Sequence, residues 1–396
     1  MIADRIKLAR RKADLSLRGL SSAMGGKVTA QAIGKYERGE DIPSSGVLTA
    51  LARALDVSLS YLLDAQEIEW SGVEFRTKAN TTARDRAQVE TEVLEWIERY
   101  VQIELILDLD SARWQRPLLP RALRKPEDAQ DLADEVRKEW GLGLEPIPNL
   151  TELLEEKGLK VLTVQLPIRV SGFTCRVAHN HEHGEILVIV VNKQFSLERR
   201  RLTLGHELGH CLIDSGGLAD KEIEKAATQF AGAFLMPGGH LLREVGKHRH
   251  ALGYKEIIEL KRLYRVSGAA LLMRLRQLNV IDDATLTYAF QTVARGWRTQ
   301  EPAPLEEAGD YGTLEKPMRF ERLCYRALAE GLISLTRAAE LLRCPASEVE
   351  AELKGPQGAH ADRREWGCKP KPQKIPGPFP TATCARPEEG RSSAQL

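Results

Sequence analysis

Apolar positions recur at helical spacing along most of the chain and give way to β-forming runs in one central region. Residues 1–65 predict five short helices separated by Ser, Gly, Thr and Asp-Ile-Pro punctuation. Helical spacing returns within 88–140. Strands are then predicted at 159–166, 172–178 and 186–192, the last a continuous aliphatic run typical of a buried strand.

Two helices are predicted directly after the strands. The first covers 197–214, with Ser196 as its N-cap, and the second covers 219–235 and is stopped by Met236-Pro237. This order of helix, strand and helix indicates an α+β fold for the block. Downstream, helices are expected within 254–280 and 319–353 and a short extended piece at 285–288.

The chain of 396 residues is long enough for two to four domains. A polar, aperiodic stretch suggests a connector after the first module, and the last 41 residues hold 7 of the 19 prolines, which predicts a disordered tail. The expected organisation is an all-α module at 1–65, a linker at 66–87, an α+β domain at 88–281, a helical C-terminal extension at 282–355 and the tail at 356–396.

Composition excludes several protein classes and leaves a soluble, globular one. The 57 Lys and Arg residues nearly balance the 56 Asp and Glu residues, so contact with nucleic acid would need a local basic patch. Neither a membrane-spanning run nor a secretion signal is visible, so we expect a cytoplasmic protein without a membrane partner. The six cysteines lie far apart without a Cys-x-x-Cys pair, so they read as free thiols that mostly pack in cores.

The sequence His206-Glu207-Leu208-Gly209-His210 lies inside a predicted amphipathic helix. This spacing places both imidazoles on one face, one turn apart, where they can bind one metal ion. With zinc and one further oxygen ligand, a coordination position stays open for water, whose proton Glu207 can accept and return to a leaving amine. The alternative is two structural histidines that hydrogen bonds satisfy.

A third ligand is expected from the following helix, which offers Glu222 and Glu224. Glu224 precedes the apolar stretch that begins at Ala226, so we choose it as the ligand. His240 is a candidate for stabilising the oxyanion during hydrolysis. His179, His181 and His183 are read as polar turn residues rather than a second metal site, and Cys211 as a core residue.

Two stretches together resemble the ImmA/IrrE family of zinc metallopeptidases: Arg200 to His210, and Glu224 to Pro237 with the sequence EKAATQFAGAFLMP. The similarity extends from about 131 to about 281. It implies a zincin-like domain with zinc as cofactor, and an endopeptidase that cuts repressor proteins. By position, His206, His210 and Glu224 would bind zinc and Glu207 would be the catalytic acid and base. Thr228 departs from the Asn usual in the family.

Residues 16–25 and 28–39 predict two short helices around a tight, glycine-containing turn, which is a helix-turn-helix pattern. The module resembles the lambda-repressor/Cro-like (XRE) DNA-binding family, including its Tyr36-Glu37-Arg38-Gly39 ending. Within 1–65, ten Lys or Arg face seven Asp or Glu, a mild basic excess. The alternative is a five-helix domain that contacts only proteins.

Entry of the second helix into the major groove would expose its first residues to base edges. Gln31 can pair with adenine, and Arg18 and Lys35 suit phosphates or guanine. Leu17 and Ala30 stand where relatives often carry Gln, so the usual polar contacts are absent there. The predicted DNA-binding residues are Arg18, Thr29, Ala30, Gln31, Ala32 and Lys35.

Together these features predict a DNA-binding transcriptional regulator fused to a zinc endopeptidase. Its expected partners are a double-stranded DNA operator and a repressor-type protein substrate, and a homodimer is plausible because helix-turn-helix modules commonly read paired half-sites. The alternative is a non-proteolytic repressor or antitoxin-like protein, whose metallopeptidase-like domain senses a ligand or binds a partner. The helical stripe within 319–353 reads as a core face more readily than as a docking groove.

Overall fold

The computed structural model describes residues 2–57, 59–63, 68–70, 83–109, 114–179, 185–214, 216 and 218–355. The chain divides into two compact units, Met1–Cys344 and Pro345–Leu396. In the second unit, the described part contains one helix, α17 (Ala346–Lys354). The tail predicted at 356–396 lies outside the described residues.

The N-terminal module is all-α, as predicted, and two of its helices begin at side-chain caps. The Ser16 hydroxyl accepts from the Gly19 amide at 3.0 Å and Thr29 from the Ala32 amide at 3.2 Å, which satisfies amides that a helix start leaves free. Arg10 pairs with Glu37 at 2.5 Å and so joins the first and third helices. The helices are α1 (Ile2–Lys12), α2 (Leu17–Ala23), α3 (Ala30–Glu37), α4 (Ser45–Leu55) and α5 (Leu59–Leu63).

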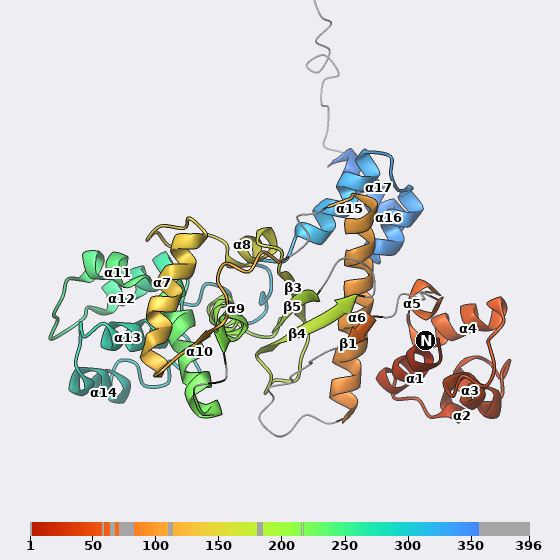
Figure 1. Cartoon of the computed structure of the whole chain (residues 1–396), viewed down its shortest axis with the longest axis horizontal. Coiled ribbons are helices and arrows are strands. Elements are labelled where there is room, and N and C mark those ends of the chain that lie inside the picture. The colour runs from red at the N-terminus through yellow and green to blue at the C-terminus, as the bar shows by residue number, and fades with distance from the viewer. Residues whose placement is uncertain are drawn as a thin grey trace, which may run out of the picture. The chain divides into compact units, whose positions relative to one another are not determined.

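The rest of the first unit is the predicted α+β region followed by further helices (Figure 1). Its strands are β1 (Ile68–Trp70), β2 (Arg121–Ala122), β3 (Lys160–Val164), β4 (Gly172–His179), β5 (Glu185–Asn192) and β6 (Ile213–Asp214). Its helices are α6 (Ala83–Ile106), the 3-10 helix η2 (Pro126–Asp128), α7 (Ala129–Glu139), α8 (Leu150–Glu156), α9 (Leu197–Leu212), α10 (Asp220–Leu235), α11 (Gly238–Val245), α12 (Tyr254–Tyr264), α13 (Gly268–Gln277), α14 (Asp283–Gln291), α15 (Arg319–Ala329) and α16 (Leu335–Leu342).

The central sheet has the strand order β1-β4-β5-β3, in which β3 runs parallel to β5 and the other pairs are antiparallel. The aliphatic run of β5 is buried on both faces, as its sequence predicts. Leu187, Ile189 and Val191 share one hydrophobic cluster with α9 and α10. On the other face, the ammonium group of Lys160 on β3 pairs with Glu104 of α6. The sheet therefore lies between α6 and the α9–α10 pair.

Helices α9 and α10 approach each other closely because their facing residues are small. A Cβ atom added to Gly205 would lie 3.2 Å from the Cβ atom of Ala231. One added to Gly209 would lie 3.1 Å from Cδ1 of Phe230 and 3.3 Å from Cα of Ala227. At both glycines a Cβ atom would therefore crowd the facing helix, and a larger side chain would require the helices to move apart.

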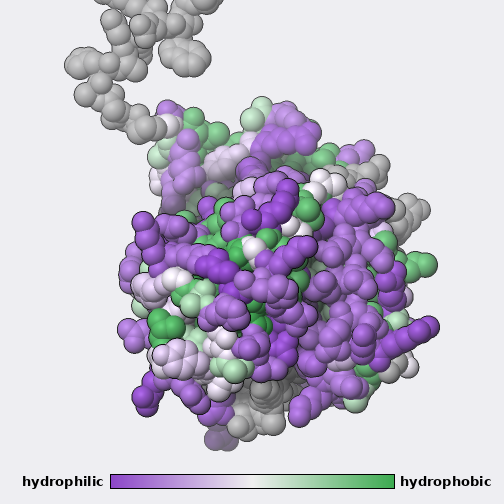
Figure 2. Space-filling model, turned by 90° about the vertical axis from the view of Figure 1, so that its left-hand side faces the viewer, coloured by the Kyte–Doolittle hydropathy of each residue, from purple (hydrophilic) through white to green (hydrophobic). Residues whose placement is uncertain are grey.

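The apolar core of the α+β region lies inside this arrangement. Phe230, Phe234 and Trp140 are buried together, and the Phe230 and Phe234 rings stack with centroids 5.6 Å apart. The face shown in Figure 2, which lies at the α11–α14 end of Figure 1, is mostly hydrophilic with separate hydrophobic patches. None of the helices in the described part of the chain is both long enough and apolar enough to cross a bilayer.

Helix α15 packs its apolar face against α6, as the interpretation of this stripe as a core predicts. Phe320 is buried, and its ring lies 5.5 Å from that of Tyr100 and 6.5 Å from that of Trp96, measured between centroids. The Arg99 guanidinium of α6 donates to the Leu341 carbonyl of α16 at 2.5 Å. Among the described cysteines, Cys175, Cys211 and Cys324 are buried thiols, and Cys344 is partly buried and forms no disulfide.

The structure corrects three local predictions. Residues 285–288 were expected to be extended but lie within α14, because the Asp282 carboxylate accepts from the Thr285 amide at 2.7 Å and starts a helix. The helix predicted at 197–214 has Ser196 at its N-cap, as predicted, but it ends at Leu212, because Ile213 and Asp214 form β6 and pair with β2. Within the linker expected at 66–87, residues 68–70 form β1 and pair with β4. Three residues carry too little periodicity to reveal such a strand.

Substitution of Gly209 by Ala should separate α9 from α10. The methyl group would lie 3.1 Å from Cδ1 of Phe230 and 3.3 Å from Cα of Ala227, so the two helices must move slightly apart. We expect a loss of about 1–3 kcal/mol of stability, as in overpacked cores. Gly46→Ala is the matched control, because a Cβ there meets nothing within 4 Å and the change favours helix. Thermal unfolding of the two variants measures the difference. A melting temperature that rises equally in both would contradict the close packing.

Candidate metal centre and nucleic-acid interface

His206 and His210 face the same space on one side of α9. Leu204, Leu208 and Leu212 turn the opposite side of the helix into the core, which leaves the two imidazoles toward α10. Their Nε2 atoms are 3.0 Å apart and the ring planes stand at 85°. Both side chains are partly shielded, with His210 9% exposed and His206 21%.

Glu224 of α10 completes a group of three ligand atoms. Its Oε2 lies 3.3 Å from Nε2 of His206, and its Oε1 lies 3.5 Å from Nε2 of His210. The three predicted ligands thus come together, with one donor atom of each within 4.8 Å of the others. The carboxylate is half exposed, so the group opens toward solvent.

The donor set fits a tetrahedral zinc ion. At metal–ligand bonds of roughly 2.0–2.1 Å, the edges of a tetrahedron are about 3.3 Å long. The 3.0 Å between the two imidazole nitrogens and the 3.3 Å from His206 Nε2 to Oε2 of Glu224 are close to such edges. His210 lies nearest the other oxygen of that carboxylate, Oε1, at 3.5 Å. Two imidazole nitrogens and one carboxylate oxygen are also a ligand set that catalytic zinc sites use. A site of this kind keeps a position for a reactant.

Thr228 holds His206 in the tautomer that a metal ligand needs. The Thr228 hydroxyl donates to the Glu224 carbonyl at 2.9 Å, so its oxygen accepts from Nδ1 of His206 at 3.2 Å. A proton on Nδ1 leaves the lone pair of Nε2 free to face the other ligands. Thr228 therefore supports the site even though it replaces the family's Asn, and its contact is with His206 as well as with the backbone of Glu224.

Glu207 points to the sheet side of the same helix turn. Its side chain is buried, and its Oε2 accepts from the Thr174 hydroxyl of β4 at 2.9 Å. Thr174 faces α9 because it stands opposite Ile189 in the ladder, on the face that packs against the helices. Sequence reasoning did not find Thr174, since only the pairing of β4 with β5 and the packing of α9 bring it to Glu207.

The remaining candidates have other contacts. Glu222, the alternative ligand, accepts from the Ala219 amide at 3.2 Å at the start of α10. His240 is buried, with Nδ1 2.6 Å from the Tyr264 hydroxyl and Nε2 3.4 Å from the Glu145 carboxylate, so its oxyanion role stays a prediction. Cys211 is a core residue as predicted, and burial raises the pKa of its thiol to about 12. The side chain of His179, and all of His181 and His183, lie outside the described part.

In the N-terminal module, the start of α3 presents polar side chains to solvent. Thr29, Gln31 and Lys35 are exposed, and Gln31 and Lys35 lie four residues apart on one helix face. Arg18 of α2 is exposed as well. Ala30 is partly exposed, whereas Ala32, which we expected to be exposed, packs in part against the core of the module. Ile33 behind them is fully buried and fixes the helix in place.

Comparison with protein families agrees with the structure of the N-terminal module and of the domain that holds the candidate metal centre. Residues 6–62 match the model of the helix-turn-helix family, and residues 156–276 match that of the IrrE N-terminal-like domain, which is of the metallopeptidase type. The chain joins a helix-turn-helix domain to an IrrE N-terminal-like domain. No curated protein matches the chain. The His206, His210 and Glu224 side chains all belong to the IrrE-like domain.

Replacement of Thr228 by Val should weaken zinc binding by roughly tenfold or more, because loss of an outer hydrogen-bond partner typically costs 10–100-fold in affinity. Valine keeps the shape but cannot accept from Nδ1 of His206. Thr228→Ser, which keeps the hydroxyl, is the control. Competition titration with a chromophoric chelator measures the affinity. Equal affinities for the Val and Ser variants would show that the hydroxyl does not orient the histidine.

In the helix-turn-helix domain, Gln31→Ala should relax the preference for particular bases. Lys35→Ala should weaken DNA binding equally for all sequences, and it should reduce the slope of the logarithm of the binding constant against the logarithm of salt concentration by about one. Both side chains are exposed at the proposed groove-facing end of α3. Selection from a randomised duplex library, followed by titration at several salt concentrations, measures both effects. Lys247→Ala, exposed in the IrrE-like domain, is the control. Unchanged selected sequences for Gln31→Ala would exclude this residue from base contact.

Proposed function

We propose that the chain is a cytoplasmic DNA-binding transcriptional regulator whose IrrE-like domain is a zinc-dependent endopeptidase that cuts a repressor protein. One observation carries the enzymatic half: His206, His210 and Glu224 converge, and the adjacent Glu207 is fixed by Thr174. A purely structural pair of histidines would not need a carboxylate from a second helix in the same place. The family match supports a regulator with a peptidase-like module.

The chain's own residues divide the proposed chemistry between them. When bound, zinc supplies Lewis acidity, which polarises a peptide carbonyl and lowers the pKa of water. His206, His210 and Glu224 would hold the ion. The Glu207 carboxylate would accept the proton of the attacking water and return it to the leaving amine. The hydrogen bond from Thr174 restricts Glu207 and keeps it oriented for both transfers.

The helix-turn-helix domain would supply the other half of the function. Double-stranded operator DNA is the proposed partner, with α3 in the major groove and Arg18 on the phosphate backbone. A homodimer would allow the reading of two half-sites. A repressor-type protein is the proposed substrate, so DNA binding and proteolysis would act in one control circuit.

Glu207→Gln tests the enzymatic half. We expect cleavage to fall by at least about a hundredfold, because the amide cannot take up the proton, while zinc still binds at one equivalent per chain. His206→Ala should lose both zinc and cleavage. Glu259→Gln, an exposed change on α12, is the control and should cleave normally. Zinc content is measured by elemental analysis, and cleavage of repressor proteins encoded beside this chain by mass spectrometry.

Two results would overturn the proposal. Cleavage that persists in Glu207→Gln would assign the activity to a contaminant or to other residues. Stoichiometric zinc and tight DNA binding without cleavage of any protein tried would favour the alternative, a non-proteolytic regulator whose IrrE-like domain serves as a sensor or partner-binding module.

A further inference from the structure

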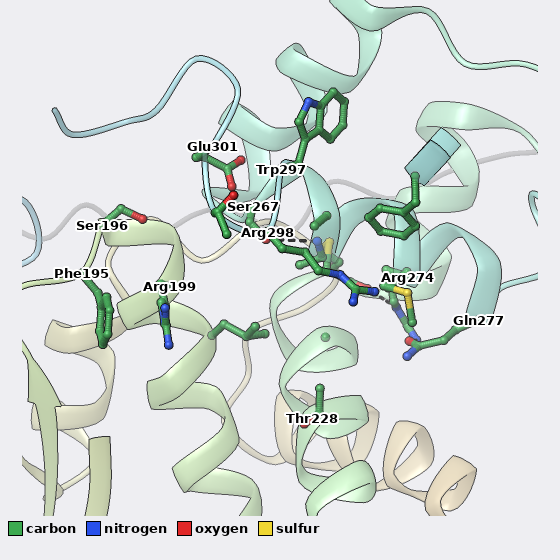
Figure 3. Close-up of a pocket in the computed structure, with 18 of the residues that line it drawn as sticks. Phe195, Ser196, Arg199, Thr228, Ser267, Arg274, Gln277, Trp297, Arg298 and Glu301 are labelled. Atoms are coloured by element: carbon green, nitrogen blue, oxygen red, sulfur yellow. Dashed lines mark hydrogen bonds between the residues drawn. The ribbon is translucent and has the colours of Figure 1, made fainter. Parts of the chain in front are cut away.

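A cavity of about 520 Å³ lies between α9, α10, α13 and the chain segment 290–311 (Figure 3). This volume falls within the range of ligand-binding sites, about 300–1,000 Å³. The segment 290–311 lies beyond the matched IrrE-like residues 156–276 and belongs to the C-terminal extension. The cavity is therefore built partly by the domain and partly by the C-terminal extension.

The cavity begins one helical turn from the candidate metal ligands. On α10, Thr228 lines it four residues after Glu224, and Gly232 and Met236 continue the same helix face. On α9, Leu202 lines it four residues before His206. Four helical residues rise about 6 Å, and an extended peptide advances about 3.3 Å per residue. If the peptide bond that is cut lies at the candidate metal site, the substrate residue about two positions along the peptide would lie beside the cavity.

The cavity combines apolar walls with positive charge. Arg199 lies over the Phe195 ring at 3.7 Å from its centroid, and Arg298 lies over the Phe290 ring at 5.0 Å. Figure 3 shows Arg298 extended between the helical walls. Within the described residues, neither guanidinium has a carboxylate partner. Although burial lowers the pKa of Arg199, an arginine stays charged at neutral pH.

Other charges of the cavity are already engaged. The Glu301 carboxylate accepts from the Gly268 amide at 2.7 Å and lies 3.5 Å from the Lys261 ammonium group. Arg274 is buried and donates to the Met236 carbonyl at 3.1 Å and to Gln130 at 2.9 Å. Its guanidinium adds a further positive charge to the wall. Arg199 donates to the Ser171 hydroxyl at 2.9 Å, but neither Arg199 nor Arg298 is neutralised by a carboxylate among the described residues. Their two positive charges therefore favour an anionic group.

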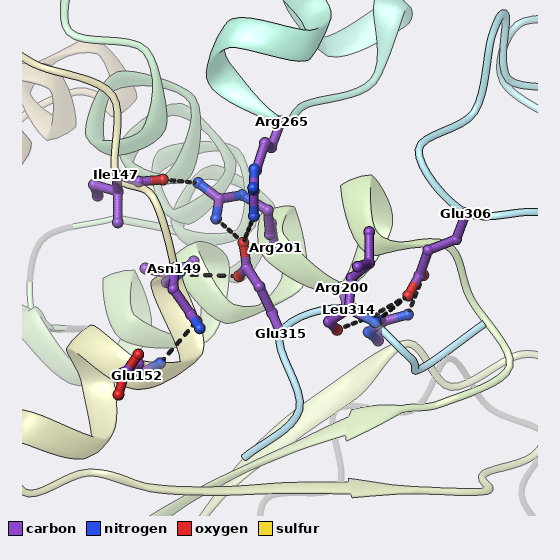
Figure 4. A network of polar contacts seen from close by, with 10 residues as sticks. Ile147, Asn149, Glu152, Arg200, Arg201, Arg265, Glu306, Leu314 and Glu315 are labelled. Atoms are coloured by element: carbon purple, nitrogen blue, oxygen red, sulfur yellow. Dashed lines mark hydrogen bonds and ion pairs between the residues drawn. The ribbon is translucent and has the colours of Figure 1, made fainter. Parts of the chain in front are cut away.

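The added wall is fixed to α9 by buried ion pairs (Figure 4). Glu306 pairs with Arg200 at 2.8 Å, and Glu315 pairs with Arg201, with all four side chains at most 4% exposed. Burial alone would raise the pKa of Glu306, but hydrogen bonds from Arg200 and the Leu314 amide lower it, so the carboxylate stays ionised. The Glu315 carboxylate also accepts from the Leu150 amide at 3.0 Å. The wall is therefore a built part of the site.

We propose that this cavity is the specificity subsite of the proposed peptidase, and that it receives a Glu or Asp side chain of the substrate protein about two residues from the bond that is cut. Arg298 and Arg199 bind the carboxylate, and Leu202, Met236 and Trp297 contact the apolar part of the segment. The proposal rests on the proposed function and assigns a role to the C-terminal extension, which supplies Arg298 and Trp297.

Binding to the full chain carrying Glu207→Gln and loaded with zinc tests the subsite without turnover. The probes are two fluorescein-labelled peptide libraries, one with Glu and the other with Gln at a single fixed position. Fluorescence anisotropy measures their binding. We expect the Glu library to bind about tenfold more tightly, as hydrogen bonds to a charged group suggest. Adding Arg199→Gln and Arg298→Gln should bring the ratio close to one. Arg295→Gln, exposed on the same segment but outside the cavity lining, should leave it unchanged.

The outcomes separate the two proposals. Equal binding of both libraries, or a preference that survives loss of both arginines, would overturn the subsite. Cleavage by the zinc-loaded wild-type chain without a preference for Glu would do the same while leaving the peptidase intact. A charge preference in binding without cleavage of any peptide would leave the subsite standing as a recognition site and remove the peptidase. Melting temperatures of the arginine variants close to that of the parent show that the fold is kept.

Discussion

The close contact between α9 and α10 is the constraint on which the candidate metal centre depends. Glu224 reaches the two histidines only because Gly205 and Gly209 let the second helix lie directly against the first. Both glycines sit next to the ligands, so the helix that carries the imidazoles also provides the surface that admits the carboxylate. Thr228 acts at the same contact and joins the backbone of one helix to a ring of the other.

The sheet adds a second constraint on the flank of α9 next to the candidate ligand face, roughly 100° around the helix axis. The alternation of β4 directs Thr174 toward the helix, where it meets Glu207, while the ligands one residue away face α10. A single helix thus divides its polar residues between two neighbours. The buried carboxylate of Glu207 and the two candidate histidine ligands can therefore lie within five residues of each other. The apolar side of the helix stays free to pack in the core.

Much of this architecture could be predicted from the sequence, and the limits have physical causes. The position of β5, the start of α9, the span of α10 and the candidate ligand trio follow from local periodicity and spacing, which the chain displays directly. Thr174, β1 and the packing of the extension depend on contacts between residues far apart in sequence, which no local pattern encodes. The helix α14 was misread because Thr and Tyr favour strands, whereas the cap at Asp282 decides the outcome.

The segment between α14 and α15 shows the same limit most clearly. Its Gly, Pro and charged residues have no amphipathic period, so the sequence predicts a C-terminal extension without indicating where this segment packs. Buried charges hold it instead: Glu306 and Glu315 enter the protein to meet Arg200 and Arg201, and the Leu305 amide donates to Glu198 at 3.0 Å. Breaking one partner of such a pair leaves an uncompensated buried charge, which typically costs about 3–5 kcal/mol. Ion pairs of this kind specify one position for the segment, and they attach it to α9, the helix that carries two of the candidate metal ligands. Helix α9 therefore both carries the candidate site residues and positions the extension, which explains why side chains of the extension line the cavity next to that site.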